Sequence, residues 1–106
     1  ALSRLPDPVF LTFDVDALDW SVVSQTGTPE PGGFTWDEIM DVLHDLFSHK
    51  RVVGLDLVEL SPREGEINSS FAVAKLLYRM IGMKAWSALR QRHLPWPPTA
   101  TGLSVV

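Results

Sequence analysis

The sequence contains no cysteine, which excludes disulfide bonds and thiolate metal sites and leads us to expect a cytoplasmic protein. It has no apolar run of membrane-spanning length and no signal-peptide pattern, so we expect no membrane partner. Basic residues are also few. Nine Lys and Arg stand against thirteen Asp and Glu, for a net charge of −4, and they form no basic stripe. Nucleic acid is therefore not an expected partner.

The chain has 106 residues, enough for one small domain, and its 45% hydrophobic and 21% charged residues are typical of a globular protein. It opens with Ala1 rather than Met, and an apolar run begins as early as Val9. A buried parallel strand normally has other strands and helices of the same sheet around it. We therefore expect this chain to be a piece of a longer protein.

Two apolar runs predict strands over residues 9–15 and 52–60. The loop between them, residues 17–34, is rich in glycine and proline, and loops of this length are usually functional. The sequence Thr35–Glu38 forms a capping box, which predicts a helix that begins there and ends near the basic residues of 49–51.

A second helix is predicted to begin at Asn68 or Ser69 and to end at Gly82. Its apolar residues between Phe71 and Ile81 are expected to face the core.

A further helical piece is predicted over 84–92, followed by a Pro-rich tail over 95–106, so that residues 1–94 form the domain. The order strand, helix, strand, helix predicts an α/β fold with a parallel sheet and flanking helices.

Carboxylates follow both predicted strands. Asp14 and Asp16 flank Val15, and strand alternation places the two acids on one face of the sheet. Two anions this close repel each other, which predicts a cation between them, and oxygen ligands suit Mn²⁺ or Mg²⁺. Glu59 ends the second strand. Because the carboxyl ends of parallel strands meet at one edge, the three acids are expected to converge there.

Three motifs follow one another along the chain: Phe13–Asp19, Thr26–Gly33 and Val53–Glu59. Together they resemble the C-terminal portion of the ureohydrolases, the superfamily of arginase and agmatinase, over residues 9–82. The middle motif is more similar to the agmatinase version of this loop. The resemblance implies a three-layer α/β/α fold, a homo-oligomer and two manganese ions in each complete site.

The resemblance also implies roles for single residues. Asp14 matches the carboxylate that bridges both metals, and Asp16 matches the one that holds a single metal. Thr28 matches a residue beside the guanidinium of the substrate, and Glu59 matches the acid that binds it. The implied reaction is hydrolysis of a small guanidino compound, agmatine-like, to urea and an amine, with Asp14 and Asp16 as the catalytic metal ligands.

The chain departs from the family pattern in two respects. Trp20 and Ser24 stand where the loop of the family usually has two prolines, which affects the shape of the loop and so substrate choice. The upstream His and Asp metal ligands are not in this chain, and its own histidines lie on or after helices. We therefore expect the 106-residue piece alone to be inactive.

Several alternatives remain open at the level of sequence. Asp14 and Asp16 could be solvated acids that cap loop amides, and Asp19 and Asp56 are expected to be structural. An apolar strand that ends in Asp-x-Asp also occurs in haloacid dehalogenase-like phosphatases. A third possibility is a non-catalytic lobe that acts in assembly, with an exposed sheet edge paired to another copy.

Overall fold

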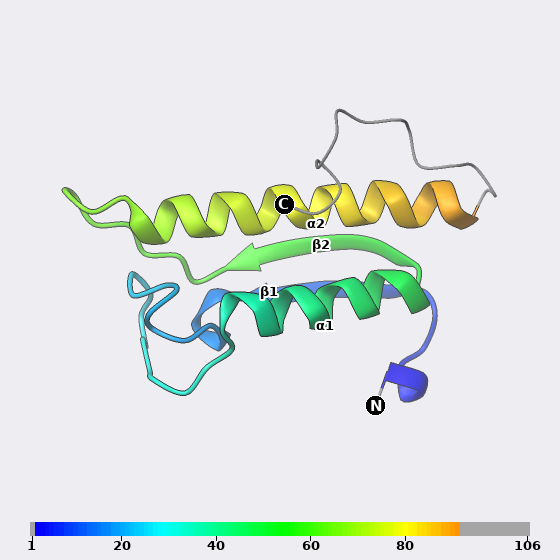
Figure 1. The fold of residues 1–106 in the computed structure, drawn as a ribbon, viewed down its shortest axis with the longest axis horizontal. Coiled ribbons are helices and arrows are strands. Elements are labelled where there is room, and N and C mark those ends of the chain that lie inside the picture. Colours follow the sequence, from blue (N-terminus) through cyan, green and yellow to red (C-terminus); the bar gives the residue numbers. More distant parts are fainter. Residues whose placement is uncertain (1, 92–106) are drawn as a thin grey trace.

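The computed structural model describes residues 2–91 (Figure 1). Two strands and two long helices alternate along the chain, with two short 3₁₀ turns near its start. The elements are η1 Leu2–Arg4, β1 Val9–Asp14, η2 Val15–Ala17, α1 Trp36–His49, β2 Val52–Val58 and α2 Asn68–Gln91. This is the predicted α/β order.

The sheet consists of β1 and β2, which pair in parallel. The register changes once, between Val9 and Phe10, and then continues to the pair formed by Asp14 and Val58. The ring of Phe10 lies over Gly54, where a Cβ atom would be only 2.7 Å from the ring. The carboxyl ends of the two strands therefore lie side by side.

Helix α1 begins as the capping box predicts. The Thr35 hydroxyl accepts a hydrogen bond from the Glu38 amide at 3.2 Å, which satisfies one of the amides that a helix start leaves free. Asp37 and Glu38 place negative charge in the first turn, and the Lys50 amide closes the last turn on the Leu46 carbonyl. The predicted bounds of this helix are confirmed.

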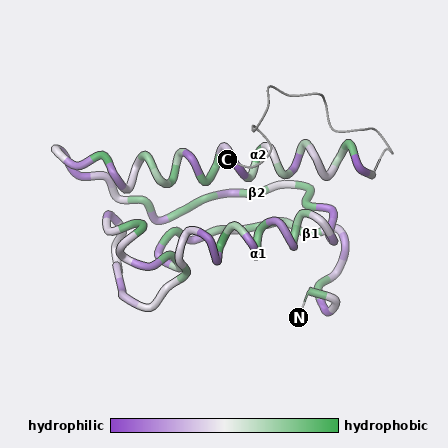
Figure 2. The backbone as a smooth tube through the Cα atoms, viewed as in Figure 1, coloured by the Kyte–Doolittle hydropathy of each residue, from purple (hydrophilic) through white to green (hydrophobic). Residues whose placement is uncertain are grey.

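Both helices pack against one face of the sheet. Figure 2 shows apolar stretches along both strands and alternating apolar and polar stretches along α1 and α2. The buried side chains from the sheet, its loops and both helices form one cluster. They are Phe13, Val15, Leu18, Val23, Ile39, Leu43, Leu46, Phe47, Val52, Val73, Leu76 and Met80. The described residues thus form two layers, and the face that carries Phe10 is open within residues 2–91.

Two predictions for the second helix were wrong. Gly82 lies inside α2, which continues without a break to Gln91, so the piece over 84–92 is not a separate element. A glycine inside a helix costs only about 1 kcal/mol relative to alanine, and packing of Met80 and Met83 on either side outweighs that cost. The predicted Pro-rich tail lies outside the described residues.

The predicted core stripe of α2 is confirmed only in part. Val73 is buried as predicted, but Phe71, Tyr78 and Ile81 are 71%, 76% and 57% exposed, and the core is completed by Leu76 and Met80. The helix has two apolar faces, and the sequence pattern does not say which one meets the sheet. Although α2 is long, no helix within residues 2–91 is both long and apolar enough to cross a bilayer.

Both strands end earlier than predicted. β1 ends at Asp14, and Val15 and Asp16 belong to the 3₁₀ turn η2. β2 ends at Val58, and Glu59 adopts a left-handed backbone conformation with φ +74°. Strand alternation therefore does not place Asp16. Its position is set by the turn.

Candidate metal and substrate site

Asp14 and Asp16 are joined through the backbone of the turn that follows β1. The Asp14 carboxylate accepts a hydrogen bond from the Asp16 amide at 3.0 Å and so caps η2. The Asp16 carboxylate accepts a hydrogen bond from the Thr28 hydroxyl at 2.7 Å. Each acid uses one oxygen in this way, and its second oxygen has no hydrogen-bond donor among the described residues. Capping of a local amide and binding of a cation are thus compatible roles for Asp14.

Glu59 lies at the same edge of the sheet as Asp14, as predicted. It directly follows β2, whose last residue, Val58, pairs with Asp14. Its Oε2 atom is 3.8 Å from the place where a Cβ atom of Gly27 would stand. Since Thr28 contacts Asp16, the Gly27-Thr28 segment links the acid of the second strand to the acids of the first.

The loop that carries Thr28 is fixed to the second half of the chain. Ser69, which is buried in the first turn of α2, accepts hydrogen bonds from the amides of Ser24 and Gln25 at 3.0 and 3.2 Å. Thr26 forms an antiparallel bridge with Leu60. The sequence pattern did not reveal this role of Ser69, because a serine at a helix start ordinarily caps its own helix.

Asp19 differs from the other acids of its motif because the chain supplies it with several donors. Its carboxylate accepts hydrogen bonds from the hydroxyl and the amide of Ser21 and from the amide of Gly32, the last at 2.7 Å. These bonds, led by the Ser21 hydroxyl, hold the pKa of Asp19 below its ordinary value. The predicted structural role of Asp19 is confirmed.

The structural role predicted for Asp56 finds no support within residues 2–91, because its exposed side chain makes no hydrogen bond or ion pair there. Trp20, in the loop between the strands, has 55% of its surface exposed.

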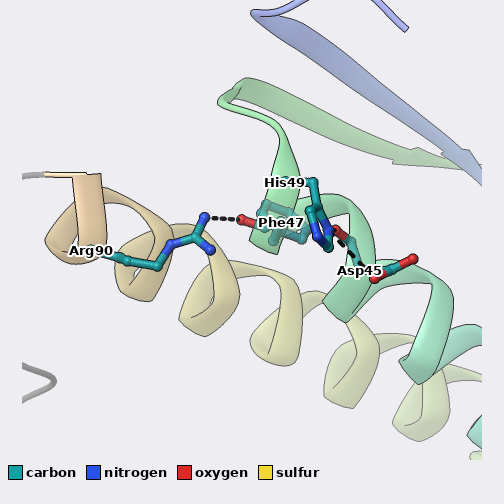
Figure 3. A network of polar contacts seen from close by, with 4 residues as sticks. All are labelled: Asp45, Phe47, His49 and Arg90. Atoms are coloured by element: carbon teal, nitrogen blue, oxygen red, sulfur yellow. Dashed lines mark hydrogen bonds and ion pairs between the residues drawn. The ribbon is translucent and has the colours of Figure 1, made fainter. Parts of the chain in front are cut away.

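The two described histidines lie away from the three acids. His44 stacks on Trp86 of α2, with ring centroids 5.3 Å apart, and His49 contacts Asp45 at the end of α1 (Figure 3). Within the described chain, no group of three or more His, Cys, Asp or Glu side chains is placed to hold a metal. Asp14 and Asp16 therefore fit a hard divalent ion in the type of their donor atoms, but not in number.

The fold and the acids define a class of protein: an α/β chain whose candidate site lies at the carboxyl ends of parallel strands. A family profile, that of the arginase family, matches residues 1–82. The chain belongs to the arginase family. This assignment removes the support for the phosphatase alternative.

Individual relatives agree with the family assignment. The chain is 43% identical over 84 residues to an agmatinase of Pyrococcus horikoshii, which covers 79% of this chain and 30% of the relative. It is 42% identical over 86 residues to an N(1)-aminopropylagmatine ureohydrolase of Synechocystis, covering 81% and 28%. The solved structure of the agmatine ureohydrolase of Thermoplasma volcanium superposes with a TM-score of 0.71 at 29% identity, covering 87% of this chain and 30% of that one.

The chain thus spans less than a third of the length of these relatives.

Proposed function

We propose that this chain is the C-terminal portion of a metal-dependent ureohydrolase that converts a guanidino substrate to urea and an amine. The observation that carries the proposal is the meeting of Asp14, Asp16 and Glu59 at one edge of the sheet. The Thr28 hydroxyl joins this group through its hydrogen bond to Asp16. None of the three acids forms an ion pair within the described residues, so cations from outside the chain can balance their charge.

In this proposal Asp14 and Asp16 hold manganese through their free carboxylate oxygens, and the remaining ligands come from outside this chain. When bound, a pair of divalent ions lowers the pKa of a shared water. The residues of this chain hold the ions in place because the Asp16 carboxylate is oriented by Thr28 and the Asp14 carboxylate by the Asp16 amide.

Glu59 and Thr28 are proposed to bind the substrate. A guanidinium group presents parallel N–H donors, and the Glu59 carboxylate can accept two of them. The Thr28 hydroxyl has its proton in the bond to Asp16, which leaves lone pairs that can accept a further substrate N–H. Both groups thus favour a flat, fully protonated nitrogen cation over a neutral ligand.

Agmatine or a related polyamine derivative is the proposed substrate, since the relatives described above are named for such compounds. We further propose that the protein is a cytoplasmic homo-oligomer. We also propose that it has no nucleic acid or membrane partner, which the net charge of −4 supports.

The test uses the protein encoded by the complete reading frame, purified with Mn²⁺. We expect urea release from agmatine or N(1)-aminopropylagmatine, with arginine as the comparison substrate, and bound manganese by elemental analysis. The 106-residue chain alone is expected to release no urea, because it holds only part of the ligand set.

Urea release by the 106-residue chain would contradict the partial site. Absence of urea release from every guanidino substrate by the complete protein would contradict the enzyme and favour the non-catalytic lobe.

A further inference from the structure

Gly27 lies beside the carboxylate of Glu59, the candidate substrate acid. A Cβ atom at Gly27 would stand 3.8 Å from Oε2 of Glu59, and no other heavy atom beyond the neighbouring residues lies within 4 Å of that place. The position is therefore next to the carboxylate that we propose binds the guanidinium, and nothing in the described chain fills it.

The fold does not require glycine at residue 27. Gly32 and Gly65 have left-handed φ angles of +89° and +86°, and a side chain at Gly33 would clash with the Asp19 amide at 2.6 Å. Gly27 has no left-handed φ, and a contact of 3.8 Å is ordinary van der Waals packing. Because glycine loses more conformational entropy on folding than alanine, the missing side chain carries a cost that the fold itself does not explain.

The surroundings of Gly27 hold its backbone in place. Thr26 is bridged to Leu60 on one side, and Thr28 is hydrogen-bonded to Asp16 on the other. Glu59 has the left-handed φ of +74°, a costly conformation for a side chain of this size, and its carboxylate is directed toward Gly27. The backbone of Gly27 thus forms a fixed wall beside Oε2.

We infer that Gly27 is a specificity-determining residue that keeps free the space in which a flat nitrogen cation lies against the backbone while it donates to Glu59. The inference rests on the proposed function. A charged N–H donor approaches a carboxylate oxygen to about 2.7–2.9 Å. A methyl group at residue 27 would stand beside that donor and take the room of the atoms attached to it.

The experiment compares Gly27→Ala with a matched control, Gly82→Ala, in the manganese-loaded protein from the complete reading frame. Gly82 lies inside α2, and a Cβ atom there would meet no atom within 4 Å outside the backbone of its own helix, whereas a Cβ atom at Gly27 would meet Oε2 of Glu59. Both variants are expected to keep or raise Tm, because both lose a glycine at a tolerant position. Only Gly27→Ala is expected to raise KM for agmatine and Ki for the guanidinium ion, by about tenfold or more, with unchanged manganese content.

Agmatine binding is also measured by calorimetry, which does not depend on turnover. Equal agmatine affinity in the wild type and in Gly27→Ala would overturn this inference alone. A clear fall in Tm or failure to fold on Gly27→Ala, with none for Gly82→Ala, would also overturn it, because glycine would then serve the fold. A wild-type protein that neither hydrolyses nor binds agmatine or the guanidinium ion would remove the proposed function, and this inference with it.

Discussion

At the carboxyl ends of β1 and β2 lie Asp14, Asp16 and Glu59, three acids that no cation of the described residues neutralises. At the amino ends of the same strands, polar side chains have hydrogen-bond partners within the chain. Asp7 accepts a hydrogen bond from the Arg51 amide at 2.8 Å, so the acid before β1 is joined to the residue before β2.

The end of α2 continues this pattern near the amino ends of the strands. Arg90 donates from its Nη2 atom to the Phe47 carbonyl at 3.2 Å, and His49 contacts the Asp45 carboxylate at 3.4 Å (Figure 3). Near the amino ends of the strands, polar side chains thus form hydrogen bonds and ion pairs with other parts of the chain. The other end leaves Asp14, Asp16 and Glu59 without a cationic partner among the described residues, so their negative charge is available to a ligand of opposite charge. The comparison supports the proposed site at the carboxyl ends of the strands.

The largest expected effect is the difference in activity between two variants that each remove one negative charge, one at the carboxyl end of the strands and one at the amino end. Asp14→Asn keeps the oxygen that caps the Asp16 amide but loses the anion, and we expect kcat/KM of the complete protein to fall by about 1,000-fold or more with loss of manganese. Asp7→Asn is the matched control, because it keeps the acceptor for the Arg51 amide and removes the same charge. Steady-state kinetics and elemental analysis provide the measurement. Equal losses in the two variants would contradict the division between the two ends.

A smaller effect is expected at Glu59. Glu59→Gln removes the charge that we propose pairs with the substrate, and we expect kcat/KM to fall by about 100-fold, chiefly through KM, with manganese retained. Glu59→Gly should lose the same activity and yet be about 1 kcal/mol more stable than Glu59→Gln, because φ is +74° at this residue. Kinetics and denaturant unfolding of both variants check this pair of outcomes. If the glycine variant is not the more stable one, the left-handed backbone carries no strain.

Local signals in the sequence predicted much of this structure. Thr35 and Glu38 fix the start of α1, and the capping bond that they form is present. The strand, helix, strand order was enough to place Glu59 beside Asp14, because parallel strands end at the same edge. These features depend on a few neighbouring residues or on topology alone.

The features that the sequence did not predict depend on distant partners. The bonds from Ser24 and Gln25 to Ser69 join residues far apart in the chain and follow no periodic pattern. The buried face of α2 was predicted only in part, because either apolar face could have met the sheet. The left-handed φ of Glu59 occurs at a residue type that rarely adopts it, so no local signal indicates it.

The smallest expected effect is a pKa shift at Asp19, which lies near Asp14 and Asp16 in sequence but accepts more hydrogen bonds from the chain than they do. Hydrogen bonds from Ser21 and Gly32 lower the pKa of Asp19 in the folded state, so the stability that they provide is fully present above the unfolded value of about 4 and is lost as pH falls through the lower folded value. Carboxyl carbon NMR of the metal-free protein should therefore give a lower pKa for Asp19 than for an unfolded aspartate. Ser21→Ala removes the leading donor and should move this pKa upward, and the stability advantage of wild type over Asp19→Asn should shrink below about pH 4. An Asp19 pKa that Ser21→Ala leaves unchanged would show that the Ser21 hydroxyl does not stabilise the Asp19 carboxylate, and would contradict its place as the leading donor.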